Sequence, residues 1–149
     1  MLWRLIMMET RSPQSIEEWN DYFDLRYRIL RTPLNQTLGS ERDDGDVSGI
    51  HFALYENQVL LAIARLDYSN TKVAQVRFVA VEENQQGRGI GRKIMEAVEN
   101  RCISDGKEKL ILHARDYALD FYLKLGYVNI EKSYKLFGVL QHFLMEKHF

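Results

Sequence analysis

Residues 75–81 read QVRFVAV, and residues 82–101 continue EENQQGRGIGRKIMEAVENR. The first segment is rich in β-branched and aromatic residues, which is typical of a strand. The second begins with a polar turn that has glycine at three alternate positions, and then places apolar residues at helical spacing. A strand that delivers glycines to a helix N-terminus exposes backbone N–H groups at the positive end of the helix dipole. The stretch therefore predicts an anion-binding site.

Three known glycine motifs can be compared with this turn. A Walker loop needs a hydroxyl residue after its lysine to hold magnesium, and here Lys93 is followed by Ile94. A dinucleotide fingerprint opens a repeated strand–helix–strand unit, whereas this turn lies in the middle of the chain after a run of predicted hairpins. The third motif, Gln/Arg-x-x-Gly-x-Gly/Ala, is matched at every defined position by Gln86, Gly89 and Gly91.

The bulk composition limits the function classes. The chain has 149 residues, 46% hydrophobic and 28% charged, with a net charge of -1. These values favour a single globular domain over residues 1–149 and give no general attraction to nucleic acid or anionic membranes. Apolar stretches are too short to span a bilayer, and the apolar residues 1–8 favour a first strand over a signal peptide. The single cysteine, Cys102, is expected to be a buried small residue in a cytoplasmic protein.

The remaining patterns predict a strand meander followed by alternating helices and strands. A first helix is expected behind Ser15, whose spacing to Glu18 is that of a capping box. Its apolar face is expected to hold Ile16, Trp19, Phe23, Tyr27 and Leu30. Residues 32–49 read as a polar loop with room for a short helical turn. Strands are expected at 51–55, 59–67, 73–81, 110–114, 127–130 and 140–147, and two further helices at 90–106 and 118–125.

Three ordered segments resemble the GCN5-related N-acetyltransferase (GNAT) superfamily. They are the strand VRFVAV, the loop QQGRGIGRKIM and the later segment ARDYALDFYLKLGY, and the C-terminal GVLQHFLMEK is similar to a closing strand of small members. The resemblance is good over residues 59–127 and looser at the termini. It implies an α+β (mixed α/β) fold, in which helices flank a mostly antiparallel sheet of about six or seven strands. Two of these strands would splay apart to form the cleft for coenzyme A.

The resemblance implies acetyl-CoA, or another acyl-CoA, as co-substrate. The strand before the loop would pair with pantetheine like an added strand, through Val79, Ala80 and Val81. The pyrophosphate would rest on the loop and the first helical turn, at Gln86, Gly87, Arg88, Gly89, Ile90, Gly91, Arg92 and Lys93. Each segment also has a simpler interpretation. The glycine turn could only cap the helix, and the strand before it could be a central strand whose backbone groups all pair within the sheet.

The expected reaction is direct attack of an amine on the thioester in a ternary complex. Tyr122 matches the family tyrosine that protonates the leaving sulfur, although it also fits a core aromatic on an apolar stripe. Gln75 stands where many members have a glutamate base and cannot accept a proton usefully. Glu82, His51 or His113 could act through water, or the amine could lose its proton to solvent. His142, on the predicted last strand, could likewise be either a structural or a catalytic residue. Arg115 replaces an asparagine that some members carry.

The acceptor is less defined than the donor. Four carboxylates between residues 41 and 46 could attract a cationic amine, or could belong to a solvated loop. A small-molecule amine is the expected acceptor, and protein N-termini or lysines are an alternative. A non-catalytic acyl-CoA-binding module is a rival function, because Gln75 replaces the usual base. No metal site, nucleic-acid partner or membrane partner is indicated. The sequence does not define the oligomeric state, although homodimers through the terminal strands are frequent in similar proteins.

Overall fold

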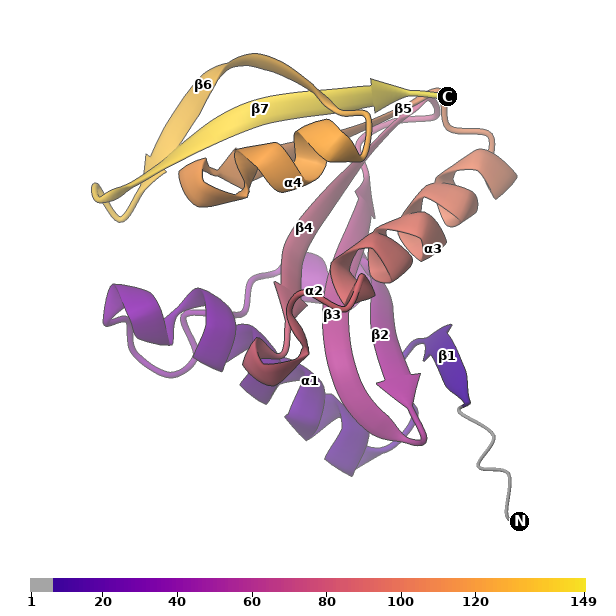
Figure 1. Cartoon of the computed structure of the whole chain (residues 1–149), viewed down its shortest axis with the longest axis vertical. Helices are drawn as coiled ribbons and strands as arrows, with labels where there is room; N and C mark the ends of the chain where they lie inside the picture. Colours follow the sequence, from indigo (N-terminus) through magenta and orange to yellow (C-terminus); the bar gives the residue numbers. More distant parts are fainter. Residues whose placement is uncertain (1–6) are drawn as a thin grey trace. The chain divides into compact units, whose positions relative to one another are not determined.

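A computed structural model describes residues 7–149, in which seven strands form one mixed sheet in the order β1-β2-β3-β4-β5-β7-β6 (Figure 1). β4 and β5 pair in parallel, whereas the β1–β2, β2–β3, β5–β7 and β6–β7 pairs are antiparallel. The strands are β1 (Met8–Arg11), β2 (Ile50–Glu56), β3 (Val59–Tyr68), β4 (Val73–Val81), β5 (Lys109–Arg115), β6 (Val128–Leu136) and β7 (Leu140–His148).

Four α-helices and three short 3-10 turns connect these strands. The helices are α1 (Ile16–Leu30), α2 (Gly45–Ser48), α3 (Ile90–Ser104) and α4 (Leu119–Lys124), and the turns are η1 (Thr32–Leu34), η2 (Glu83–Gln85) and η3 (Asp116–Ala118). The predicted fold class is confirmed, and β4 has the predicted bounds. No helix within residues 7–149 is long and apolar enough to cross a membrane.

Two sequence predictions for the strands need adjustment. β6 is nine residues long rather than four, and eight of its residues are exposed. β6 is the last strand of the sheet, and the charged residues Glu131 and Lys132 in its middle obscure the strand pattern in the sequence. The first strand predicted at residues 1–8 lies mostly outside the described residues, and the strand seen there begins at Met8.

The described chain contains two compact units. The first comprises residues up to Leu66 together with Phe78–Val98, and the second comprises Asp67–Arg77 and Glu99–Phe149. β4 and α3 each contribute residues to both units. The candidate anion loop belongs to the first unit, whereas Tyr122 and His113 belong to the second.

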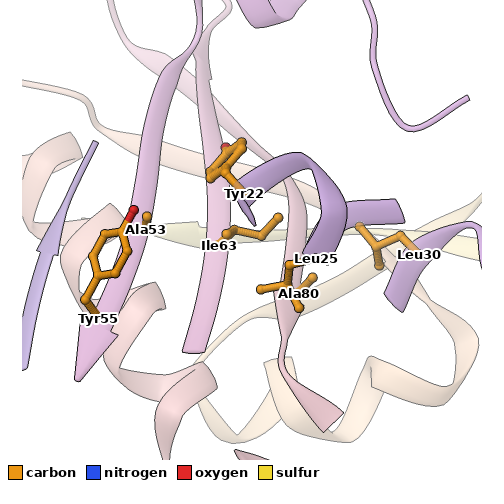
Figure 2. Packing of buried hydrophobic residues seen from close by; sticks show 7 residues of the cluster. All are labelled: Tyr22, Leu25, Leu30, Ala53, Tyr55, Ile63 and Ala80. Carbon is orange, nitrogen blue, oxygen red and sulfur yellow. The ribbon is translucent and has the colours of Figure 1, made fainter. Parts of the chain in front are cut away.

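The core of the first unit lies between α1 and strands β2–β4. Figure 2 shows seven of its buried residues, which are Tyr22, Leu25, Leu30, Ala53, Tyr55, Ile63 and Ala80. Ser15 caps α1 as predicted, since its side chain accepts the Glu18 N–H at 3.1 Å. The predicted apolar face of α1 is partly wrong, because Ile16 is 77% exposed while Arg26 is fully buried. Arg26 can be buried in this face because it forms an ion pair with Asp46.

The second unit packs one face of β5 and leaves the other face partly open. Leu110, Leu112 and Ala114 are buried, together with Cys102 of α3, as predicted for that cysteine. Burial raises the pKa of the Cys102 thiol to about 11, so it is not a reactive thiolate at neutral pH. Because side chains alternate along a strand, His113 of β5 points to the face opposite these apolar residues.

Candidate active site

The glycine loop has an open, left-handed backbone at the start of α3. Gly87 and Gly89 have φ values of +84° and +75°, which L side chains rarely adopt. A Cβ added to either glycine would meet no atom within 4 Å, so the space above them is open. The Lys93 N–H donates to the Gly89 carbonyl at 3.1 Å, so the amides of Ile90 and Gly91 come before the first helical hydrogen bond. This geometry fits a phosphate-sized anion.

The three loop cations differ in their availability to such an anion. Arg88 is held by Glu56, 3.2 Å from its Nη1, and by Gln85. The Lys93 ammonium lies 3.3 Å from the Met8 sulfur, which is no counter-ion. Arg92 is exposed and has no ion pair within the described part of the chain. Arg92 and Lys93 are therefore the cations free to approach a bound phosphate.

β4 changes its backbone geometry halfway along. Among the described residues it pairs with β5 only at Val73, Ala74 and Gln75. Three residues later, Phe78 has a φ of +55°, a conformation that costs an aromatic residue about 1–3 kcal/mol. Regular parallel pairing thus ends before β4 reaches residues 79–81, where the acyl-CoA contacts are predicted. Ala80 is buried in the core, whereas Val79 and Val81 remain partly accessible.

Arginine side chains surround the strained Phe78. The guanidinium of Arg26 lies 4.1 Å from the Phe78 ring centroid, and those of Arg65 and Arg31 lie at 5.0 and 5.7 Å. All three arginines are buried, with at most 8% of their surface exposed. Cation–π attraction strengthens when the charge is desolvated, so these contacts help to hold Phe78 in its left-handed conformation.

Asp46 is the common counter-ion of two of these arginines. Its carboxylate accepts hydrogen bonds from Arg26 Nη1 at 2.8 and 3.0 Å and from Arg65 Nη1 at 2.8 Å. These hydrogen bonds hold the pKa of Asp46 below its usual value, although its partial burial acts in the opposite direction. The buried charges of Arg26 and Arg65 are therefore compensated, as burial in a protein interior requires.

We expect Arg26→Ala to lower the free energy of unfolding by about 3–5 kcal/mol, because it leaves Asp46 short of a buried partner. The matched control is Arg28→Ala, on the same helix. The Arg28 side chain is 43% exposed and pairs with Asp24 and Glu82, so its loss should cost less than about 1 kcal/mol. Chemical denaturation of both variants tests this, and similar losses in the two would contradict a special role for the buried pair.

Two of the candidate bases are already engaged. The Glu82 carboxylate receives both Arg28 nitrogens at 2.8 and 3.0 Å, which lowers its pKa. In His51, Nδ1 contacts the Tyr22 hydroxyl and Nε2 contacts the Asp46 carbonyl, each at 2.8 Å. A carboxylate of lowered pKa is a weak proton acceptor, and an imidazole with both nitrogens bound has no lone pair to offer.

Tyr122 lies on α4 in a nearly closed aromatic setting. Its ring makes edge contacts with Phe121 and Tyr127, with centroids 4.9 and 5.7 Å away, and only 7% of the residue is exposed. Among the described residues its hydroxyl has no hydrogen-bond partner, and it is not sealed from solvent. Burial raises the pKa of the Tyr122 phenol, so it stays protonated at neutral pH. The phenol therefore has a proton to donate, although the raised pKa makes it a weaker acid than an exposed tyrosine.

His113 carries a nitrogen that is free to accept a proton. Its Nδ1 lies 2.9 Å from the Ser133 hydroxyl, whereas its Nε2 has no hydrogen-bond partner within residues 7–149. Burial, followed by the nearby charge of Arg77, lowers the pKa of His113. The imidazole is therefore neutral at pH 7. Among the described residues of the second unit, no hydrogen bond or ring contact joins His113 to Tyr122.

Comparison with known proteins identifies the family. The sequence model of the acetyltransferase (GNAT) domain matches residues 9–149. The chain belongs to the GNAT acetyltransferase family. It is therefore an acyl-CoA-dependent N-acetyltransferase in the general sense of that family. The uncharacterized N-acetyltransferase YjcF of Bacillus subtilis is 24% identical over 131 residues, which cover 88% of this chain and 93% of YjcF.

Solved GNAT structures have the same fold. A putative N-acetyltransferase from Lactobacillus plantarum superposes with a TM-score of 0.82 at 19% identity, covering 97% of this chain and 99% of the other. An aminoglycoside 6'-N-acetyltransferase complexed with coenzyme A gives a TM-score of 0.78 at 15% identity, covering 95% and 96% of the two chains. These likenesses confirm the GNAT fold. The prediction that residues 1–149 form one domain stays a prediction.

Residues 41–46 form neither the cation-attracting loop nor the solvated loop that their sequence suggested. Glu41 is 2% exposed, and its carboxylate accepts the Gly39 N–H at 2.8 Å. Asp43 and Asp46 bind the buried arginines. Of the four carboxylates, only that of Asp44 is exposed without a hydrogen bond or ion pair to another described residue. The loop is thus neither a free attractant for cations nor a fully solvated segment, and no group of possible metal ligands occurs in the described part of this GNAT chain.

Proposed function

We propose that this GNAT enzyme transfers the acetyl group of acetyl-CoA to the amine of a small molecule. The observation that carries the proposal is the open left-handed loop at the start of α3, where Gly87 and Gly89 leave room for a phosphate. The pyrophosphate would rest on the amides of residues 87–92, with Arg92 and Lys93 adding charge. Val79, Ala80 and Val81 would carry the pantetheine contacts, with Gln86, Arg88, Ile90 and Gly91 completing the loop.

We assign two proton transfers to residues of the second unit: one to the departing thiolate and one from the attacking amine. The amine nitrogen forms a bond to the thioester carbonyl carbon, and the carbon–sulfur bond breaks. The departing thiolate takes a proton from the Tyr122 hydroxyl, and the proton lost by the amine goes to His113. His113 is preferred to Glu82 as the proton acceptor because its Nε2 is unpartnered, whereas Arg28 binds both Glu82 oxygens.

We expect His113→Gln to lower kcat by about 100-fold, the usual scale of a lost general base. The neutral imidazole is the active form, so wild-type kcat at saturating amine should fall as the pH drops through the lowered pKa of His113, below its ordinary value of 6.5. The variant should lose this limb of the pH profile. His148→Gln, at an exposed position beside Glu146, is the control and should keep it. An unchanged profile in His113→Gln would remove His113 from the reaction.

Thiol release from acetyl-CoA, measured against a panel of amines, separates this proposal from its rivals. Thiol release that depends on one amine, with the acetylated amine found by mass spectrometry, is the expected result. An acyl-CoA-binding module would be stabilised by acetyl-CoA and acetylate nothing. A panel that includes peptides with free N-termini and lysines tests the protein-acceptor alternative. A cytoplasmic location remains a prediction.

A further inference from the structure

A second histidine, His142 of β7, lies near His113. The register of β5 and β7 places Arg115 opposite His142 and His113 opposite Leu144. His113 and His142 are therefore diagonal neighbours on one face of the sheet, where such Cα atoms are about 7–8 Å apart. Tyr134 of β6 contacts both rings, with centroids 5.2 Å from His113 and 4.5 Å from His142. These three rings form one cluster within the second unit.

The proton position on His142 follows from its backbone contact. Its Nδ1 lies 3.1 Å from the Leu140 carbonyl oxygen, which can only accept a hydrogen bond. Nδ1 therefore carries the hydrogen, and in the neutral ring Nε2 carries the lone pair. The residue is 4% exposed, and the Tyr134 ring stacks on it at an interplanar angle of 15°. Both the tautomer and the plane of the ring are thus fixed.

The lone pair of His142 has no acceptor role in the fold. Within residues 7–149, Nε2 has no hydrogen-bond partner, and it is not among the polar atoms sealed from solvent. Charged and titratable groups face the ring from three elements, namely Arg115 and His113 of β5, Asp116 of η3 and Tyr134 of β6. Burial first, and then the Arg115 and His113 charges, lower the pKa of His142. The ring is an oriented hydrogen-bond acceptor at neutral pH.

We infer that His142 is a substrate-binding residue, whose Nε2 accepts a hydrogen bond from the acceptor's amine nitrogen while His113 removes the proton. The inference rests on the proposed function and adds an amine-binding residue to it. A primary amine has two N–H groups, one for each imidazole, and keeps its lone pair for the thioester carbon. His142 keeps its Nδ1 proton throughout and gains none.

His142→Phe is the direct test, because it keeps an aromatic ring against Tyr134 and removes the acceptor nitrogen. We expect the KM for the amine to rise about tenfold, the scale of one hydrogen bond of about 1.4 kcal/mol. The KM for acetyl-CoA should change less than about twofold. His142→Gln should restore part of the amine KM, because its amide can donate to the Leu140 carbonyl while its oxygen accepts. A purely structural residue would move both KM values together.

The outcomes distinguish this inference from the proposed function. If the wild-type protein acetylates no amine, both the proposed function and the inference about His142 are wrong. A wild-type enzyme that acetylates amines, with an unchanged amine KM in a folded His142→Phe, overturns the role of His142 alone. If His142→Phe does not fold, 15N NMR of wild type bound to coenzyme A decides, since the preferred amine must then shift the His142 Nε2 signal.

Discussion

Gly89→Glu should weaken acyl-CoA binding by about 100-fold while the protein stays folded. The added Cβ would meet no protein atom within 4 Å, so the substitution brings no internal clash. The new carboxylate would lie at the N-terminus of α3, where it would compete with the pyrophosphate for the same amides and repel it. Losing about 3 kcal/mol of charge-assisted hydrogen bonding weakens binding by about 100-fold. The loss of the melting-temperature rise with acetyl-CoA measures this effect.

The matched control for this substitution is Gly106→Glu. Gly106 also has a φ of +75°, also has no atom within 4 Å of an added Cβ, and lies after the end of α3. Both variants add one negative charge and a strained backbone residue, so both should lose some stability. Only Gly89→Glu should lose the response to acetyl-CoA. An equal response in the two variants would place the phosphate elsewhere.

Tyr122→Phe should lower kcat by about 100-fold and leave acyl-CoA binding unchanged. The proposed role of this phenol is to protonate the departing thiolate, and a general acid contributes about 100-fold or more to a rate. The hydroxyl has no hydrogen-bond partner among the described residues, so its removal should cost little stability. Steady-state kinetics with acetyl-CoA and the preferred amine, together with the melting shift, separate the two effects.

Tyr127→Phe is the control for this second variant. Tyr127 is also buried, its ring contacts Tyr122, and its hydroxyl donates to Glu99 at 2.8 Å. Removing that hydrogen bond should cost about 1 kcal/mol of stability and leave kcat unchanged. If Tyr122→Phe lost stability but kept its turnover, Tyr122 would be a core aromatic, the alternative that its apolar neighbours allow.

Most helices and strands were predictable because the residue types and apolar spacing of each segment match the structure that it adopts in the fold. β4 combines β-branched residues with a glycine turn, and its bounds were predicted correctly. β6 was underestimated because Lys132 interrupts the alternation of Val128, Ile130, Tyr134 and Leu136, and the strand lies exposed at the edge of the sheet. The buried face of α1 was misjudged because Arg26 is buried. A fully buried arginine is rare without a partner, and its partner Asp46 is 20 residues away in the sequence.

The candidate site divides in the same way. The backbone of the loop was predictable because glycines at alternate positions favour a left-handed turn, and Gly87 and Gly89 have positive φ values; its role in phosphate binding stays a prediction. The left-handed Phe78 left no sequence signal, because its cost is offset by arginines from distant segments. The tautomer of His142 also depends on a contact that only the fold creates, although the sequence did mark the residue as ambiguous. Isolated polar residues reveal their role only when their partners are known.

The central claim is that the loop before α3 binds the pyrophosphate of an acyl-CoA. Its most direct test is the melting temperature of the wild-type protein with acetyl-CoA, compared with acetyl-pantetheine, which has the thioester but no pyrophosphate. Acetyl-CoA at about 100 times its Kd should add about 2.7 kcal/mol of stability. For a chain of this size that is a rise of about 5–10 °C. Acetyl-pantetheine should give almost none. No shift with acetyl-CoA at millimolar concentration, or an equal shift with both compounds, would contradict the account.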